Sequence, residues 1–282
     1  MYVRRSPIWS DPRVKPPFGA AQIAWGHPLA RMLHSVFLLN EGGGTVVTAL
    51  GSSPVRGTFV TVATPPVWRT RREGKAPVFP GTANGEITLT PSGLFAMVAP
   101  FSCELWWDWQ TADGDKGSWT GGFDNRISGQ AGFQLSEEAG STTTYRPHLV
   151  IWSGSAETNH FKATSTYSRP FNRKFLWTWD GTTAQIYVDG RSDSATTSTS
   201  TGYGSPTTIR LGGGLGSQTI AGAIQKFTIW NRVLSPSEAL WLYAEPYAFL
   251  QPVIRRRRFV LAAAGVSARA SHALVGSAAG WW

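Results

Sequence analysis

The chain has 282 residues, of which 41% are hydrophobic, and contains fourteen Trp, fourteen Phe and thirty-one Gly. This length allows one large domain, and the aromatic, glycine-rich composition favours many strands joined by tight turns. A disulfide framework is excluded because the only cysteine is Cys103, and the lack of an apolar run of about 18 residues argues against a transmembrane helix or a signal peptide.

The net charge of +9 is concentrated at the two ends of the chain. Residues 1–25 carry +3 and residues 251–282 carry +5, whereas residues 26–250 contain 17 basic and 16 acidic side chains. A nucleic-acid-binding domain usually carries its positive charge on its folded surface. The nearly neutral body with two cationic ends predicts instead that the protein is attached through those ends.

The first segment, residues 1–25, is predicted to be a Pro-rich basic arm. It contains four prolines and shows no helical or strand periodicity. One folded domain is predicted over residues 26–250, and a second, Arg-rich arm over residues 251–282. The domain opens with an apolar strand around Val36 and Leu38, which ends at three consecutive glycines.

Short segments with alternating apolar residues follow at close spacing and are predicted strands. Turn-forming residues separate them, and the Ser- and Thr-rich stretch 192–205 is predicted to be an exposed loop. Many short strands with regular turns indicate a sandwich or a barrel. The predicted strands are residues 57–63, 85–90, 101–110, 132–136, 148–152, 174–180, 184–189, 207–211 and 223–230.

Residues 174–191 contain the clearest pattern, that of two consecutive hairpins. Apolar residues alternate from 175 to 179 and again from 184 to 188, and an Asp-Gly pair follows each run, at 180–181 and at 189–190. Asp-Gly pairs between alternating strands favour two-residue hairpin turns. An antiparallel meander is therefore predicted here.

Residues 235–244 form the one clear predicted helix. Ser235 can cap its N-terminus, Pro236 suits the first helical position and Glu238 completes a capping box. Pro246 ends it.

Two of these segments resemble a known family. The hairpin segment, with Trp-Thr-Trp-Asp-Gly and Tyr-Val-Asp-Gly, resembles a signature of laminin-G-like jelly rolls of the concanavalin A type, and residues 224–235 resemble the last strand of that family. The resemblance covers residues 26–246. It implies an all-β, antiparallel β-sandwich with one short C-terminal helix and extended N- and C-terminal arms, in a family that binds sugars and proteins and includes enzymes only where specific carboxylates are added.

The strand around residues 101–109 carries the candidate carbohydrate-binding residues. Alternation places Glu104, Trp106 and Asp108 on one face and Cys103, a small residue expected to be buried, on the other. The two carboxylates lie about 13 Å apart along a strand, at about 3.3 Å per residue, which is too far for a glycosidase pair. We therefore expect that the protein is not an enzyme and that it has no catalytic residue. An outward Trp between two acceptors can stack a sugar ring, unless another layer of the protein covers it.

Metal binding is the weaker alternative. Asp113, Asp115, Asp124 and Asn125 offer oxygen ligands of the kind that calcium takes, but they do not follow a calcium-loop pattern and are common in turns. The five histidines have no metal-ligand spacing. We expect no metal and no cofactor, with Ca²⁺ as the open alternative.

The two arms carry the candidate partner-docking residues. An Arg run followed by apolar residues and a terminal Trp pair can dock on an acidic protein surface, contact phosphates or remain solvated. Both ends of the chain, including residues 15–30, resemble those of bacteriophage-encoded laminin-G-like proteins. The docking residues are Arg4, Arg5, Arg255, Arg256, Arg257, Arg258, Phe259, Trp281 and Trp282.

These features together predict a non-enzymatic structural or decoration protein of a phage virion. Its basic arms would dock on capsid or tail subunits, as a homo-oligomer or a symmetric array, with the jelly roll facing outward. The alternative is a carbohydrate-binding module of a tail fibre or spike that recognises a host-surface glycan. Neither nucleic acid nor a membrane is an expected partner.

Overall fold

A computed structural model provides the structure of the chain. It describes residues 14–52, 55–60, 65–81, 85–90, 100–110, 119–124, 132–141, 144–153, 156–168, 170–197, 209–213 and 220–253.

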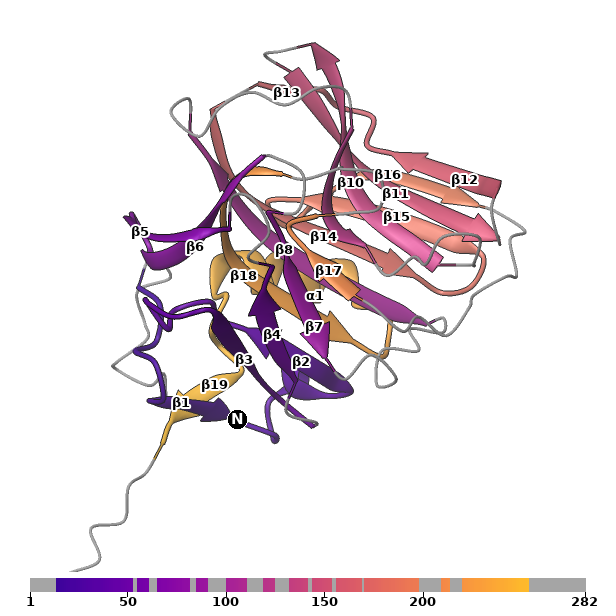
Figure 1. The fold of residues 1–282 in the computed structure, drawn as a ribbon. Helices are drawn as coiled ribbons and strands as arrows, with labels where there is room; N and C mark the ends of the chain where they lie inside the picture. Colours follow the sequence, from indigo (N-terminus) through magenta and orange to yellow (C-terminus); the bar gives the residue numbers. More distant parts are fainter. Residues whose placement is uncertain are drawn as a thin grey trace, which may run out of the picture.

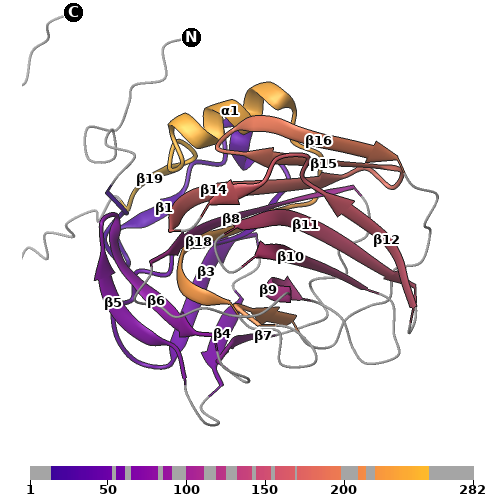
Figure 2. The same ribbon diagram turned by 90° about the horizontal axis from the view of Figure 1, so that it is seen from above.

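Two antiparallel sheets pack face to face, as predicted for a β-sandwich (Figures 1 and 2). One of them, here called the helix-side sheet, has β18 near its centre, with β2 and β6 pairing along different halves of that strand. Its order is β16 (Arg191–Thr197), β15 (Thr183–Val188), β14 (Phe171–Trp179), β8 (Phe101–Trp109), β18 (Ala221–Trp230), then β2 (Leu33–Phe37) beside β6 (Gly74–Pro80), with β5 (Val67–Arg71) on β6.

The opposite sheet shares one strand with the helix-side sheet. This strand, β3 (Val46–Gly51), pairs with β4 (Arg56–Phe59) in the opposite sheet and with β2 in the helix-side sheet. A short strand, β13 (Tyr167–Ser168), pairs with β11 (Thr144–Ser153). The order is β12 (Ala156–Lys162), β11 (Thr144–Ser153), β10 (Gly132–Ser141), β9 (Trp119–Asp124), β17 (Ile209–Leu211), β7 (Ile87–Thr90), β4 (Arg56–Phe59) and β3 (Val46–Gly51).

The main hydrophobic core lies between the two sheets. Alternate residues of β8 point into it, among them Phe101, Cys103 and Trp107. Cys103 is fully buried, as predicted, and burial raises the pKa of its thiol well above the ordinary value. An unreactive, apolar role for this cysteine follows.

A second hydrophobic layer covers the outer face of the helix-side sheet. It consists of the 3-10 helix η1 (Pro28–Ala30), helix α1 (Pro236–Ala244) and a two-stranded ribbon of β1 (Ala21–Ile23) and β19 (Leu250–Pro252), as Figure 2 shows for α1 above β15 and β16. Side chains from this layer and from the sheet form one buried cluster. The fold therefore has three layers: the opposite sheet, the helix-side sheet and this covering layer.

The predicted domain boundary at residue 26 lies inside the folded part. Residues 14–25 include β1, which pairs with β19, and Lys15, whose ammonium group is buried and donates to the carbonyls of Leu39 (3.2 Å) and Lys75 (2.9 Å). The sequence could not indicate this, because a three-residue strand is too short to display alternation and its partner lies about 230 residues away. Fold elements also continue to residue 253.

Each of the nine predicted strands overlaps an observed one, and several observed strands were not predicted. One correction concerns residues 192–197, predicted as loop, which belong to β16 and pair with β15. Ser and Thr at these positions give no apolar alternation, so only the hairpin register reveals the strand. Residues 198–205 lie outside the described residues. The strands missed outright are β1, β3, β5, β6, β9, β12, β13 and β19.

Both Asp-Gly pairs turn the chain as predicted, but only the second is a two-residue turn, because residues 180–183 lie between the last paired residues of β14 and β15. Asp189 and Gly190 both have positive φ, of 52° and 77°, as a type I′ hairpin turn requires. At Gly190 a Cβ would lie 2.7 Å from the Cβ of Tyr243, so α1 packs directly on this turn. At the other turn, the Asp180 carboxylate accepts from the backbone N–H groups of Thr182 and Thr183.

The capping box of α1 is also confirmed. The Ser235 hydroxyl accepts from the Glu238 N–H at 3.3 Å, and the Glu238 carboxylate accepts from the Ser235 N–H at 2.9 Å. The helix buries Ala239 and Leu242, whereas Tyr243 stays exposed. Within the described part of the chain, no helix has the length and apolarity needed to cross a bilayer.

Candidate functional site

Glu104, Trp106 and Asp108 share one face of β8, as alternation predicted, but that face is not open. Their exposed fractions are 1%, 4% and 2%. The second hydrophobic layer covers them, and the Trp106 ring belongs to its buried cluster with the Tyr247 ring 6.4 Å away. The expectation of an outward Trp106 is thus corrected: Tyr247, from the segment after α1, packs beside its ring, and the Lys174 ammonium lies over the ring at 4.3 Å.

The two carboxylates of this face are already engaged. Glu104 Oε2 lies 2.7 Å from the ammonium of Lys226 and accepts from the Thr228 hydroxyl at 3.1 Å. Asp108 lies 3.7 Å from the guanidinium of Arg71 and accepts a hydrogen bond from the Gln110 amide. Buried charges need such partners, so these two carboxylates are engaged within the helix-side sheet and are not free to bind a ligand.

Trp106 nevertheless reaches the wall of a polar cleft of about 310 Å³ at the edge of the second layer. Five parts of the chain meet there: the β5–β6 turn, β8, the start of β14, the β15–β16 turn and the C-terminal end of α1. A cleft of this size is at the lower end of the range for small-ligand sites, about 300–1,000 Å³. Its lining residues are Arg72, Glu73, Trp106, Asn172, Lys174, Asp189, Tyr243 and Ala244.

A chain of hydrogen bonds crosses the floor of the cleft. The indole N–H of Trp106 donates to Asn172 Oδ1 at 2.5 Å, and the Asn172 amide donates to Glu73 Oε1 at 2.7 Å. The second carboxylate oxygen of Glu73 is buried and has no hydrogen-bond partner among the described residues, although Glu73 is only 5% exposed. A buried acceptor without a donor is costly, so Glu73 is held in the wall of the cleft at some expense of stability.

Lys174 stands between the two aromatic side chains of the cleft. Its ammonium lies 4.3 Å from the Trp106 ring centroid and 4.9 Å from that of Tyr243, and it donates to the Tyr243 carbonyl at 2.7 Å. Burial, together with the smaller effect of the nearby Lys226, lowers the pKa of Lys174 to about 8. This face of the Trp106 ring therefore holds a cation, and the aromatic pair positions Lys174.

Asp189 is fixed by the hairpin turn. Its carboxylate accepts from the Lys174 backbone N–H at 3.0 Å and pairs with the Arg173 guanidinium at 2.5 Å. The turn sequence that predicts the hairpin thus also orients one wall of the cleft.

The other predicted site residues are not brought to this cleft. Asp124 is buried in β9, and the described residues include no cluster of three or more side chains able to hold a metal ion. The remaining calcium candidates and all the docking residues lie outside the described residues: Asp113, Asp115, Asn125, Arg4, Arg5, Arg255, Arg256, Arg257, Arg258, Phe259, Trp281 and Trp282.

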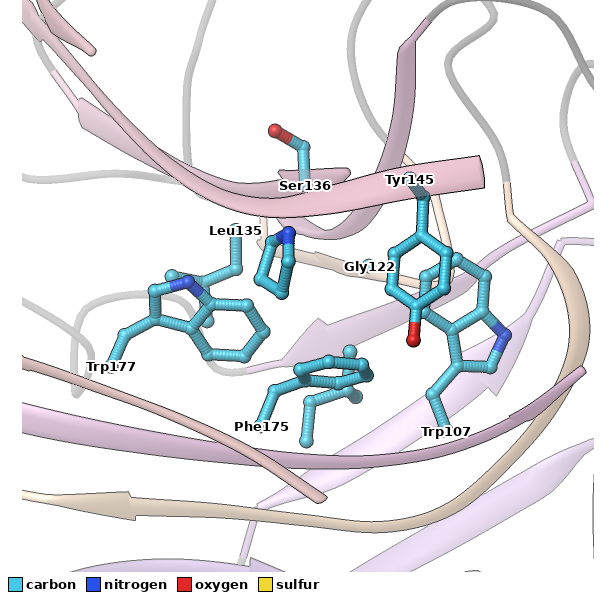
Figure 3. Close-up of a pocket in the computed structure, with 9 residues that line it drawn as sticks. Trp107, Gly122, Leu135, Ser136, Tyr145, Phe175 and Trp177 are labelled. Carbon is cyan, nitrogen blue, oxygen red and sulfur yellow. The ribbon is translucent and has the colours of Figure 1, made fainter. Parts of the chain in front are cut away.

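A second cavity lies inside the sandwich and is too small for a sugar. Figure 3 shows Trp107, Tyr145, Phe175 and Trp177 around it, in the main core. Its volume is about 10 Å³, close to the minimum for a single water of about 10–15 Å³. This gap belongs to core packing.

Sequence reasoning missed Glu73, Asn172, Lys174, Asp189 and Tyr243 as site residues. Asp189 and Lys174 lie in the predicted hairpin segment. Its turn pattern predicts where they lie along the strands, but not that they line the same cleft. Glu73 sits in a short turn between two unpredicted strands, and nothing in its sequence neighbourhood marks it.

The fold and this cleft define a lectin-type β-sandwich with a polar site on one edge. Residues 80–239 match the model of the concanavalin A-like lectin/glucanase superfamily, laminin-G type, and the chain belongs to that family. No curated protein sequence matches the chain.

Solved structures with the same fold come from several kinds of protein. Domain 4 of AbnA, a GH43 extracellular arabinanase from Geobacillus stearothermophilus, in complex with arabinotriose, is 16% identical with a TM-score of 0.53, covering 79% of this chain and 99% of that chain. The binding domain of Paraclostridial Mosquitocidal Protein 1 is 15% identical (TM-score 0.59; 76% and 52% covered). Trypanosoma rangeli sialidase in complex with sialic acid is 17% identical (TM-score 0.55; 77% and 33% covered).

Proposed function

We propose that this chain is a non-enzymatic carbohydrate-binding module whose ligand occupies the cleft at Trp106. The observation that carries the proposal is the 310 Å³ cleft itself, whose wall combines polar side chains with the aromatic rings of Trp106 and Tyr243. Asn172, Lys174 and Arg72 offer hydrogen-bond partners for the hydroxyls of a sugar. Membership of a lectin-type family and the arabinotriose complex of an arabinanase domain with the same fold support the assignment.

The absence of catalysis is part of the proposal. Glu104 and Asp108, the carboxylates of β8, are held in ion pairs, so neither is available as a proton donor or nucleophile. Incubating the purified protein with the glycans that it binds and measuring new reducing ends tests this. Release of reducing ends above the level of a Glu73→Gln variant would overturn the non-enzymatic assignment.

Glycan-array binding of three matched proteins tests the site. Glu73→Gln and Tyr243→Ala change the cleft, and Tyr243→Ala removes only a half-exposed ring while keeping the backbone carbonyl that Lys174 uses. Trp25→Ala removes an exposed aromatic ring outside the cleft and serves as the control. Binding lost in both cleft variants and kept in the control supports the proposal, whereas unchanged binding in both cleft variants overturns it.

A second candidate is a structural protein of a phage virion, docked through its arms on capsid or tail subunits. The division of charge supports it, since residues 1–25 and 251–282 carry +8 of the net +9. The test replaces the four arginines at residues 255–258 with serine and measures how much of the variant is incorporated into phage particles. Incorporation at the wild-type level would overturn this candidate and leave the carbohydrate-binding module as the proposed function.

A further inference from the structure

Both carboxylate oxygens of Asp189, in the wall of the cleft, already have partners within the protein. One of its oxygens accepts from the Lys174 N–H and the other pairs with Arg173. Its negative charge is therefore balanced within the wall. The other charged side chains of the cleft are those of Lys174, Arg72 and Glu73.

Two of these three are cations with unused donors. The Lys174 ammonium has three N–H donors, and the only protein acceptor that it has among the described residues is the Tyr243 carbonyl. The rings of Trp106 and Tyr243 also lie beside it, and ring faces accept only weakly. Arg72 lines the same cleft and is exposed, with a planar guanidinium that fits a carboxylate through two parallel hydrogen bonds.

The third group, Glu73, is held within the wall of the cleft. Its Oε1 accepts from the Asn172 amide at 2.7 Å, and its Oε2 is buried. The charged groups that can meet a ligand are therefore the two cations. A ligand that fits them carries an anionic acceptor, and an acidic sugar supplies one.

We infer that the cleft binds an acidic sugar residue, whose carboxylate is held by Lys174 and Arg72. This inference rests on the proposed carbohydrate-binding function and names the class of sugar. Asn172 hydrogen-bonds both Trp106 and Glu73 and so fixes the floor of the cleft.

The test uses pairs of glycans that differ only at the carboxyl group. Oligosaccharides ending in glucuronic, galacturonic, mannuronic or sialic acid are each compared with the same glycan after its carboxyl has been reduced to an alcohol, up to millimolar concentration. We expect at least one acidic member to bind and its reduced counterpart to bind at least tenfold more weakly.

Three variants locate the effect. Arg72→Ala and Lys174→Met should shrink the preference for the acidic member, and the exposed Arg72 can be changed without disturbing the core. Arg56 is an exposed cation on the opposite sheet, so Arg56→Ala is the control. This variant should keep the preference for the acidic glycan.

The outcomes separate the two levels of the claim. Equal binding of acidic and reduced glycans, or a preference that survives both cleft variants, overturns the inference and leaves the proposed function standing. Binding of no glycan, acidic or neutral, overturns the proposed function and the inference with it.

Discussion

Glu104 and Lys226 form an ion pair at 2.7 Å between two hydrophobic layers, where their side chains are 2% and 0% exposed. Lys226 also donates to the Pro246 carbonyl at 2.7 Å and lies between the rings of Tyr247 and Phe249. The pair therefore ties the segment after α1 to the centre of the helix-side sheet. It explains why Glu104 serves structure while the neighbouring Trp106 reaches the cleft.

Breaking this pair should destabilise the protein strongly. Lys226→Met leaves Glu104 buried without its counter-charge, which typically costs about 3–5 kcal/mol. Urea denaturation of the single variant measures the loss. The double variant Glu104→Leu with Lys226→Met should recover most of it, because an apolar pair avoids the desolvation cost; a double variant less stable than the single one would contradict this account.

The stability contributed by Lys15 should rise with pH. Burial lowers its pKa from 10.5 to about 7. Between these values the unfolded chain binds more protons than the folded one, so the free energy of unfolding increases with pH, by at most about 1.4 kcal/mol per unit. Subtracting the stability curve of Lys15→Met, recorded from pH 6 to 9.5, isolates this slope. Parallel curves would contradict the burial of a titrating Lys15.

Gly190 should be required for the packing of α1 on the hairpin turn. In Gly190→Ala the new Cβ meets Tyr243 at 2.7 Å in addition to the strain of a positive φ. Gly19→Ala is the matched control, since its φ is similarly positive and no atom lies within 4 Å. Thermal melts should show a larger loss for Gly190→Ala, by about 1–3 kcal/mol; equal losses would mean that backbone strain alone matters.

Trp106→Ala should cost stability as well as binding. Truncating a buried Trp typically destabilises by about 3–5 kcal/mol, and here it also frees Lys174 and Asn172. A melting temperature that stays at the wild-type value would indicate that Trp106 is exposed in solution.

Truncation at the N-terminus distinguishes the predicted from the observed domain boundary. A chain starting at residue 26 lacks β1 and Lys15, whereas a chain starting at residue 14 keeps both. The shorter chain should unfold at clearly lower urea concentration than the longer one. Coincident unfolding curves would place the boundary at residue 26 after all.

Local sequence determined much of the fold. The Asp-Gly turns, the capping box of Ser235 and Glu238, and the alternation along β8 each depend on residues within a few positions of one another, so their physics can be read directly. The all-β class and the antiparallel sandwich follow from these signals.

Only the tertiary structure decided what covers the outer face of β8. Alternation places Trp106 on a face but does not say whether that face meets solvent, a second sheet or a helix. The cleft is likewise invisible in the sequence, because Glu73, Asn172, Asp189 and Tyr243 come from segments up to 170 residues apart. Their proximity depends on strand order and on the packing of α1 against Gly190, and both are set by long-range burial.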